Sequence, residues 1–344
     1  MNLESLVRKN IFNLSPYSCA RDEFKGEASV YLDANESPYN RKYNRYPDPK
    51  QEDLKKRISQ IKKINPERIM LGNGSDEVID LVFRIFCEPA VDNVVAIEPT
   101  YGMYKVCADI NNIEYRKVEL GKFFQPDAEK ILEATDRNTK VIFLCSPNNP
   151  TGNVLSRWRI LKIIESFQGI VVIDEAYIDF TDEPSWLKDL DKYPNIIVLH
   201  TFSKAWGLAS LRCGMAFASE EIIALFNKVK YPYNLSSLVQ HTVLSQLDVG
   251  SDYKDQWVKM ILDERECLLD ALKSAPLVDE IYPSDANFLL VKVKDANGIY
   301  NKLVEKGIIV RNRNSVALCG NCLRITIGTD KENKALIDCL KMLK

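Results

Sequence analysis

The chain is poor in the residues from which metal centres are built. Its 344 residues include only two histidines, His200 and His241. Cys319 and Cys322 form a single Cys-x-x-Cys pair without a second pair or a nearby histidine, whereas a structural zinc site needs four such ligands. The sequence therefore predicts no metal site.

Charge and hydrophobicity exclude further classes of protein. The formal net charge is −2 at pH 7, and the absence of a basic block argues against nucleic acid as a partner. No apolar run is long enough to span a bilayer, and the first ten residues lack the apolar stretch of a signal peptide. The nine cysteines lie mostly in apolar segments, as free thiols of a reducing compartment do. We expect a cytoplasmic protein without a membrane partner.

Short apolar, β-branched runs alternate with amphipathic helical patterns over most of the chain. Such alternation is typical of a parallel sheet with right-handed helical crossovers. We therefore predict an α/β fold with a mostly parallel central sheet and helices on both faces. The predicted strands cover residues 69–71, 94–97, 141–145, 170–173 and 196–199.

The alternation stops near Tyr231, and the remainder is typical of a smaller α+β unit. A long helix comes first, and its apolar stripe has the spacing of a packing surface rather than of a ligand site. We predict an N-terminal segment over residues 1–40, a large domain over 41–235 and a small C-terminal domain over 236–344. The elements predicted after the long helix are strand 286–293, helix 299–306, strands 308–311 and 323–327, and helix 333–343.

The most informative stretch follows the predicted strand at residues 196–199. It reads HTFSKAWGL over residues 200–208 and closes at Arg212. Open α/β sheets bind ligands at the carboxyl ends of their strands. A lysine held away from water can lose its proton and form a Schiff base with an aldehyde cofactor. A polar loop with a solvated Lys204 is the alternative, because most lysines are exposed.

A glycine-containing loop over residues 72–77 precedes an apolar helix. Backbone amides at a helix N-terminus can hold an anion, and Gly74, Ser75 and Asp76 would supply them. Alternatively, Ser75 or Asp76 is an ordinary helix N-cap. The spacing is not that of a dinucleotide-binding Gly-x-Gly-x-x-Gly, since Glu77 stands where the third glycine would be. A nicotinamide-binding protein is therefore disfavoured.

Polar and aromatic residues follow the predicted parallel strands. Because parallel strands end at one edge of a sheet, we expect these residues to converge there. An aromatic face, an amide, a carboxylate, a phenol and a primary amine would then share one site. The set is Tyr101, Asn149, Asp174, Tyr177 and Lys204.

This set fits an aldehyde cofactor that carries a pyridine ring and a phosphate. Lys204 would bind the aldehyde, and Asp174 would keep the ring nitrogen protonated. Tyr101 would stack on the ring, while Asn149 and Tyr177 would hold its hydroxyl. The groups available to the phosphate are Gly74, Ser75, Asp76, Thr201, Ser203 and Arg212.

Four strings carry a resemblance to a known family: SPNNPTG at 146–152, DEAY at 174–177, TFSKAWGLASLRCG at 201–214 and LRITIGT at 323–329. With them the chain resembles the fold-type I pyridoxal-phosphate aminotransferases, and the likeness covers nearly its whole length. Within that family it is most similar to the subfamily that acts on L-histidinol phosphate, through NLSPY at 13–17, LDANE at 32–36 and NRYPD at 44–48.

The resemblance implies a homodimer and further binding residues. Tyr46 corresponds to a tyrosine that reaches the cofactor phosphate of the neighbouring subunit. Arg324 corresponds to the arginine that binds the carboxylate of the amino-acid substrate, and Arg311 to a second arginine that meets the substrate phosphate. Tyr17 and Asn35 correspond to residues that line the substrate pocket.

The resemblance also implies a reaction. Such an enzyme, with pyridoxal 5'-phosphate, would transfer the amino group of L-histidinol phosphate to 2-oxoglutarate, giving imidazole-acetol phosphate and L-glutamate in histidine biosynthesis. The N-terminal segment would pack with the small domain or with the partner subunit. Arg313, an added cation two residues beyond Arg311, is expected to be solvated.

Three other functions stay open on the sequence. A threonine-phosphate decarboxylase has the same fold and motifs but removes a carboxylate from its substrate. An aromatic-amino-acid aminotransferase is the second, because the subfamily can accept aromatic rings. A catalytically silent binding protein is the third, although it would not need the residues Lys204, Asp174, Asn149 and Tyr177 together.

Overall fold

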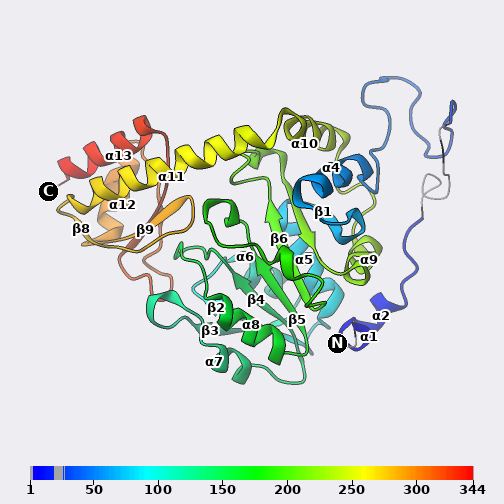
Figure 1. Cartoon of the computed structure of the whole chain (residues 1–344), viewed down its shortest axis with the longest axis horizontal. Helices are drawn as coiled ribbons and strands as arrows, with labels where there is room; N and C mark the ends of the chain where they lie inside the picture. Colours follow the sequence, from blue (N-terminus) through cyan, green and yellow to red (C-terminus); the bar gives the residue numbers. More distant parts are fainter. Residues whose placement is uncertain (1–2, 19–25, 27, 344) are drawn as a thin grey trace.

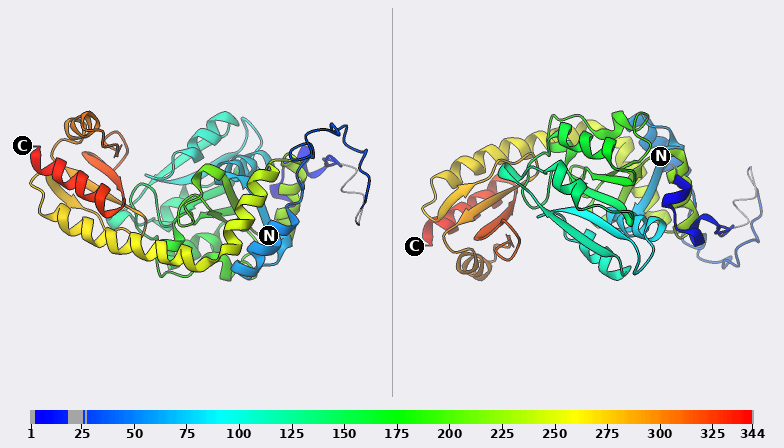
Figure 2. Two further views of the ribbon diagram at one scale, coloured as in Figure 1. Left: turned by 90° about the horizontal axis from the view of Figure 1, so that it is seen from above. Right: turned by 90° about the horizontal axis from the view of Figure 1, so that it is seen from below.

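Two sheets organise the chain. The computed structural model describes residues 3–18, 26 and 28–343. A seven-stranded and a four-stranded sheet lie side by side, and the long helix α11 (Ser251–Lys273) runs along both (Figure 1). Figure 2 shows the four-stranded unit at one end of the molecule and the N-terminal segment at the other. None of the described helices is both long and apolar enough to cross a membrane.

The larger sheet has the strand order β1-β7-β6-β5-β4-β2-β3. Every neighbouring pair is parallel except the two pairs that β7 makes, with β1 and with β6. The predicted mostly parallel sheet is thus confirmed. Its strands are β1 (Ile69–Asn73), β2 (Asn93–Glu98), β3 (Glu114–Glu119), β4 (Thr139–Cys145), β5 (Ile170–Asp174), β6 (Ile196–Thr201) and β7 (Cys213–Phe217).

Helices cover both faces of this sheet because the central strands are apolar on both faces, as parallel strands usually are. In β5, Val171 and Ile173 enter one core while Ile170 and Val172 enter the other. The helices of the first core are α4 (Glu52–Lys62), α8 (Arg157–Ser166) and α10 (Ser237–Val249), with α7 (Ala128–Glu133) beside α8. Those of the second are α5 (Gly74–Phe86), α6 (Met103–Ile110) and α9 (Glu220–Val229).

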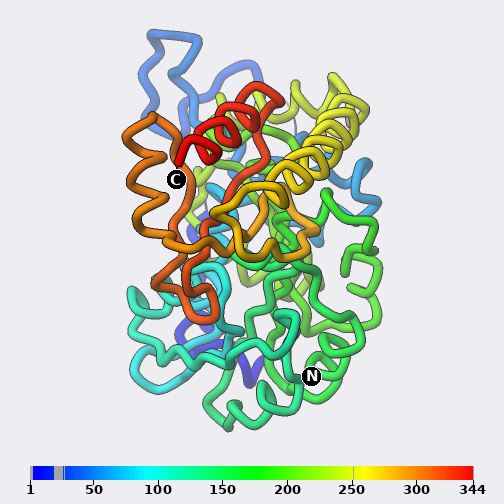
Figure 3. Tube along the Cα trace, turned by 90° about the vertical axis from the view of Figure 1, so that its left-hand side faces the viewer, coloured from blue at the N-terminus to red at the C-terminus, as the bar shows by residue number. Residues whose placement is uncertain are grey.

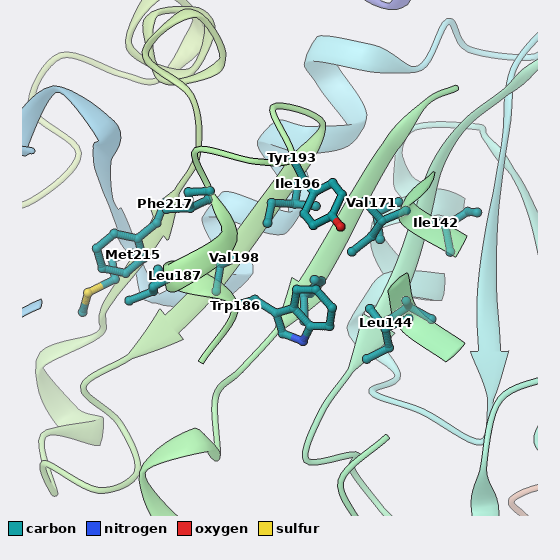
Figure 4. Close-up of a cluster of buried hydrophobic side chains, with 14 of the residues drawn as sticks. Ile142, Leu144, Val171, Trp186, Leu187, Tyr193, Ile196, Val198, Met215 and Phe217 are labelled. Carbon is teal, nitrogen blue, oxygen red and sulfur yellow. The ribbon is translucent and has the colours of Figure 1, made fainter. Parts of the chain in front are cut away.

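Figure 4 shows the first of these cores. Side chains from β4, β5 and β6, among them Leu144, Val171 and Val198, gather with the rings of Trp186 and Tyr193. The core runs along these three parallel strands and holds them together. Short 3-10 helices connect the main elements: η1 (Pro66–Arg68), η2 (Lys122–Phe124), η3 (Ile178–Phe180), η4 (Trp186–Asp189) and η5 (Ala209–Leu211).

The smaller unit is an antiparallel sheet covered by helices on one face. Its strand order is β10-β11-β9-β8, and Figure 3 shows the C-terminal helix, in red, between the orange helix and the end of α11. Leu268 and Leu272 of α11 are buried in the same core as Leu289. The elements are β8 (Val278–Ile281), β9 (Phe288–Val293), α12 (Ala296–Glu305), β10 (Arg311–Asn312), β11 (Cys322–Thr326) and α13 (Asp330–Met342).

The structure differs from the prediction in several strands. No strand was predicted for β3, β7 or β8. The predicted strand 308–311 was wrong in extent, because pairing begins only at Arg311, while Ile308 and Val310 pack against the core without entering the sheet. Arg324, the second residue of the predicted strand 323–327, lies in the middle of β11 opposite Arg311.

The start of the chain packs on the larger unit. The short helices α1 (Leu3–Leu6) and α2 (Lys9–Phe12) precede it, and Val7 and Ile11 are buried in the second core. Arg8 forms an ion pair with Glu88 at 3.0 Å. Residues 28–47 instead project from the body ahead of α4 (Figure 1). The division into three parts stays a prediction.

Close packing of α5 on β7 positions the first turn of that helix. A Cβ atom on Gly214 of β7 would lie 2.3 Å from the amide nitrogen of Ser75, which is well inside van der Waals contact. Gly74 has a φ of +75°, and a Cβ there would lie 2.7 Å from a guanidinium nitrogen of Arg212. Both positions therefore require glycine for the helix N-terminus to approach the sheet edge.

We expect Gly214→Ala to push the first turn of α5 away from β7. Overpacking of this kind costs about 1–3 kcal/mol of unfolding free energy, which chemical denaturation would measure. Gly102→Ala is the control, because no atom lies within 4 Å of a Cβ built there. Equal stability of the two variants would show that α5 can shift without cost.

Candidate active site

A cavity of about 340 Å³ opens where the parallel strands end, facing β10 and β11 of the smaller unit. One wall comes from the ends of β4, β5 and β6 and the start of α5, and the opposite wall carries arginines of the small sheet. The predicted convergence of residues at the strand ends is therefore present. The lining residues are Ser75, Asp76, Tyr101, Cys145, Asn149, Asp174, Ala176, Tyr177, Thr201, Ser203, Lys204, Arg212, Arg311, Arg313 and Arg324.

Four residues proposed from the sequence do not line the cavity of this chain. Gly74 lies next to it, beside Arg212. Tyr17 is 72% exposed, and Asn35 is exposed. Tyr46 of the projecting region stacks on the ring of Tyr233, which lies between α9 and α10, with 4.5 Å between ring centroids. Their assignment to the site stays a prediction.

Asp174 is the last residue of β5 and is buried. One carboxylate oxygen accepts a hydrogen bond from the Tyr104 hydroxyl at 2.7 Å, and the other accepts one from the Ala176 amide at 3.0 Å. Burial raises the pKa of Asp174 to about 6, although both hydrogen bonds act in the opposite direction. A cation beside this carboxylate would remove the cost of burying it.

Tyr104 is a contact that the sequence interpretation missed. It lies on α6, three residues beyond Tyr101, and its side chain is fully buried. Tyr101 precedes α6, so helical spacing does not link the two positions, and the sequence carried no local signal for this contact. Burial and the nearby Asp174 raise the pKa of the Tyr104 hydroxyl, which therefore stays a hydrogen-bond donor.

Lys204 faces the same cavity from the loop after β6. Its ammonium nitrogen lies 5.6 Å from the centroid of the Tyr177 ring. Burial lowers the pKa of Lys204, and the nearby Arg324 lowers it further, while the carboxylates of Asp174 and Asp76 oppose both effects. A lowered pKa gives the amine more of the neutral form that attacks a carbonyl carbon.

The start of α5 forms one end of the cavity. Asp76 accepts a hydrogen bond from the Tyr101 hydroxyl at 2.9 Å and forms an ion pair with Arg212 at 3.3 Å. The Gly74 amide donates to the Arg212 carbonyl at 2.8 Å, which ties the helix to the lysine loop. With the Ser203 hydroxyl nearby, these groups make an end of the cavity suited to a phosphate.

Three arginines form the opposite wall. Arg311 of β10 pairs across the sheet with Arg324 of β11, and a guanidinium nitrogen of Arg324 donates to the side-chain oxygen of Asn149. The expectation that Arg313 would be solvated was wrong, because the strand pairing places it in the cavity wall. Burial lowers the pKa of Arg313 to about 10, and its two neighbouring arginines add to this effect.

Cys145 and Ala176 were also absent from the sequence interpretation. Cys145 ends β4, and burial and the nearby Asp174 raise the pKa of its thiol. The thiol therefore stays protonated and lines the cavity as a neutral group rather than acting as a nucleophile. Within the described part of the chain, no group of three or more histidine, cysteine, aspartate or glutamate residues could hold a metal ion.

The residues present fit pyridoxal phosphate and an anionic substrate. The Asp174 carboxylate accepts two hydrogen bonds and has lone pairs left to accept more. It could therefore also accept one from a protonated ring nitrogen. The Nε atoms of Arg313 and Arg324 are buried without a hydrogen-bond partner, as expected of donors that await a ligand. Five cationic side chains line the cavity against only two carboxylates, so an anion would be favoured there.

Comparisons with known proteins bear on this site. The model of the family "Aminotransferase class I and II" matches residues 9–340. The histidinol-phosphate aminotransferase of Bacteroides fragilis (strain YCH46) is 59% identical over 340 residues, covering 98% of each chain.

Solved structures share the fold. The histidinol-phosphate aminotransferase of Clostridium acetobutylicum has a TM-score of 0.80 at 22% identity, covering 88% of this chain and 91% of its own. That of Sinorhizobium meliloti, in complex with pyridoxal-5'-phosphate, has a TM-score of 0.79 at 24% identity and coverage of 86% and 82%. The L-threonine-O-3-phosphate decarboxylase of Porphyromonas gingivalis reaches 0.72 at 20% identity and coverage of 86% and 90%. At these identities the likeness establishes the fold alone.

The raised pKa of Asp174 predicts how the stability of the cofactor-free protein depends on pH. The folded chain binds this proton more tightly than the unfolded chain, whose carboxyl has the ordinary pKa of 3.8. Wild-type stability should therefore fall relative to Asp174→Asn as pH rises from about 4 to about 6, and level off above. The relative loss should reach about 2–3 kcal/mol, measured by chemical denaturation at each pH.

Asp182→Asn serves as the control for this pH series, because Asp182 is exposed. Its stability curve should run parallel to that of the wild type. A curve for Asp174→Asn that also runs parallel would contradict the assigned cost of burying the Asp174 carboxylate.

Proposed function

The chain belongs to the class I and II aminotransferases, and on that basis we propose that it transaminates L-histidinol phosphate with 2-oxoglutarate, using pyridoxal 5'-phosphate. The products are imidazole-acetol phosphate and L-glutamate, as in histidine biosynthesis. The observation that carries the proposal is one cavity that holds Lys204, Asp174 and a wall of arginines. The identity of 59% with a histidinol-phosphate aminotransferase over nearly both chains supports the choice of substrate.

The proposed cofactor site uses the wall made by the large sheet. Bound pyridoxal phosphate supplies an aldehyde carbon and a ring that accepts electrons. Lys204 would bind at that carbon and later carry a proton to and from the substrate carbon. Asp174 would hold the proton on the ring nitrogen, and Tyr177 and Asn149 would hydrogen-bond the ring hydroxyl.

The remaining contacts to the cofactor would orient its ring and phosphate. Tyr101 would stack on the ring. Ser75, Ser203 and Arg212 would bind the phosphate, together with the Thr201 hydroxyl and the first amides of α5, at Gly74 and Asp76. The support for this assignment is that these groups lie at one end of the cavity.

The proposed substrate site uses the arginine wall. Arg324 would bind the carboxylate of glutamate, and Arg311 would bind the phosphate of histidinol phosphate. Asn149 accepts a hydrogen bond from Arg324, so it would hold that guanidinium toward the cofactor ring. Two cations suit a pair of substrates of which one carries a carboxylate and the other a phosphate.

The projecting region favours a homodimer. Large apolar side chains there are exposed in the single chain, including Val30 at 68%, Leu32 at 92% and Tyr39 at 79%. Apolar patches of this kind mark interaction sites. In the proposed dimer Tyr46 would reach the cofactor phosphate of the partner, and Tyr17 and Asn35 would complete its substrate pocket.

Two further assignments are part of the same proposal. A cytoplasmic location is supported by free cysteines: all eight within the described residues are unpaired, and most are buried. Residues 41–235 would form the large domain and residues 236–344 the small one, with the first 40 residues contributing to the dimer.

We expect the wild-type enzyme, loaded with cofactor, to convert L-histidinol phosphate in a single half-reaction. Absorbance of the pyridoxal form should be replaced by that of the pyridoxamine form, with one imidazole-acetol phosphate released per site. L-Threonine phosphate should leave the spectrum unchanged. Release of carbon dioxide from L-threonine phosphate, with no conversion of histidinol phosphate, would identify a lyase instead.

Lys204→Ala is the control for this half-reaction. It should retain the fold, as judged by circular dichroism, and lose turnover. Substantial residual turnover would contradict the catalytic role assigned to Lys204.

We expect Tyr46→Phe to weaken cofactor binding about tenfold or more, because a hydrogen bond to a charged group contributes about 1.5–3 kcal/mol. Equilibrium titration with pyridoxal phosphate measures this. Tyr43→Phe, also exposed in the projecting region, is the control.

Mixed dimers test whether Tyr46 acts on the partner. A dimer of one Tyr46→Phe and one Lys204→Ala subunit has one site with Lys204 from the first and Tyr46 from the second. That site should bind the cofactor as the wild type does. Unchanged affinity of Tyr46→Phe itself would contradict the role.

A further inference from the structure

Strand pairing turns Arg313 toward the site. Asn312 of β10 pairs with Leu323, and the Arg313 amide then donates to the Cys322 carbonyl at 2.9 Å, so the pairing continues past the end of β10. Residues two apart on an extended strand share a face. Arg313 therefore lies on the same face as Arg311, and both line the cavity.

The arginine wall has no internal counter-charge. Among the described residues, no carboxylate lies within ion-pair distance of Arg311, Arg313 or Arg324, although nearly twenty other ion pairs are formed. Cations that face each other across a sheet repel. The Nε atoms of Arg313 and Arg324 are also buried and unpartnered. An anion with several acceptor oxygens would offset the repulsion between the arginines and would also accept hydrogen bonds from these Nε donors.

The charges of the two proposed substrates differ at this wall. The far end of glutamate carries a single carboxylate charge, whereas a phosphate monoester carries about −1.5 to −2 at neutral pH. Arg311 alone would leave the charge of such a phosphate partly uncompensated, while Arg324 already donates a hydrogen bond to Asn149. A second arginine on the face of Arg311 balances the phosphate charge.

We propose that Arg313 binds the substrate phosphate together with Arg311 and thereby selects phosphate-bearing substrates over carboxylates at this end of the cavity. This inference rests on the proposed function of the same site. Arg313 directly follows β10 and lines the same cavity as Arg311, so the two guanidinium groups can bind one phosphate. It acts in binding and touches no reacting atom.

Arg313→Gln in the cofactor-loaded enzyme tests the proposal. The KM for L-histidinol phosphate should rise about tenfold to a hundredfold, with kcat within about twofold of the wild type. The KM for L-glutamate should change much less, and Arg313→Lys should lie between wild type and glutamine. A merely structural role would raise both KM values together, which would overturn the proposal, as would no change in either.

Direct binding separates this inference from the proposed function. Inorganic phosphate titrated calorimetrically into the cofactor-loaded enzyme should bind at least about tenfold more weakly to Arg313→Gln than to wild type. Arg137→Gln, an exposed arginine before the opposite end of β4, is the control and should bind as wild type does. Equal phosphate affinity of all three proteins would overturn the role of Arg313 whatever the natural substrate. A wild type that binds phosphate through Arg313 but does not convert histidinol phosphate would overturn only the proposed reaction.

Discussion

Burial of charge without a counter-charge governs this active site. Asp174 is fully enclosed at the end of β5, and its hydrogen-bond donors, Tyr104 and the Ala176 amide, are neutral. On the facing wall, arginines accumulate without carboxylates. The wall of the large sheet balances Asp76 and Asp174 with Lys204 and Arg212, whereas the facing wall carries an excess of positive charge. A ligand with a cationic ring nitrogen at one side and anionic groups at the other complements this arrangement.

The strand ends that line the cavity must be held in fixed positions, and a buried hydrogen-bonded pair outside the cavity, Glu175 and His200, contributes to this. Glu175, directly after Asp174, accepts hydrogen bonds from His200 at 2.8 Å and from the Trp186 amide at 2.8 Å. Burial lowers the pKa of His200, so its ring stays neutral near pH 7. The pair links the end of β5 to the end of β6, three residues before Lys204. The pair thereby helps to fix the separation of Asp174 and Lys204 from outside the cavity, whose lining includes neither Glu175 nor His200.

The sequence predicted those parts of the molecule that depend on local pattern. β4, β5 and β6 are runs of buried β-branched residues, and parallel order alone brings the residues that follow them to one edge. β3 was missed because it is a charged edge strand, and β7 because it is short and contains Gly214. Tyr104 was missed and Arg313 misjudged for another reason. Their positions depend on how α6 packs against the large sheet and on how β10 pairs with β11. Packing and pairing between separate elements leave no signal in the local sequence.

The two walls of the site are also connected through the loop that carries Asn149. The Asp285 amide of the small unit donates to the Gly152 carbonyl at 2.7 Å, and its carboxylate accepts from the Val154 amide at 2.8 Å. Arg324 adds a third link by its hydrogen bond to Asn149. In the proposed mode of binding, a substrate carboxylate that moved Arg324 would therefore also act on Asn149. Because that loop belongs to the large sheet and Arg324 to the small one, a ligand held at the arginine wall would act on the contact between the two sheets.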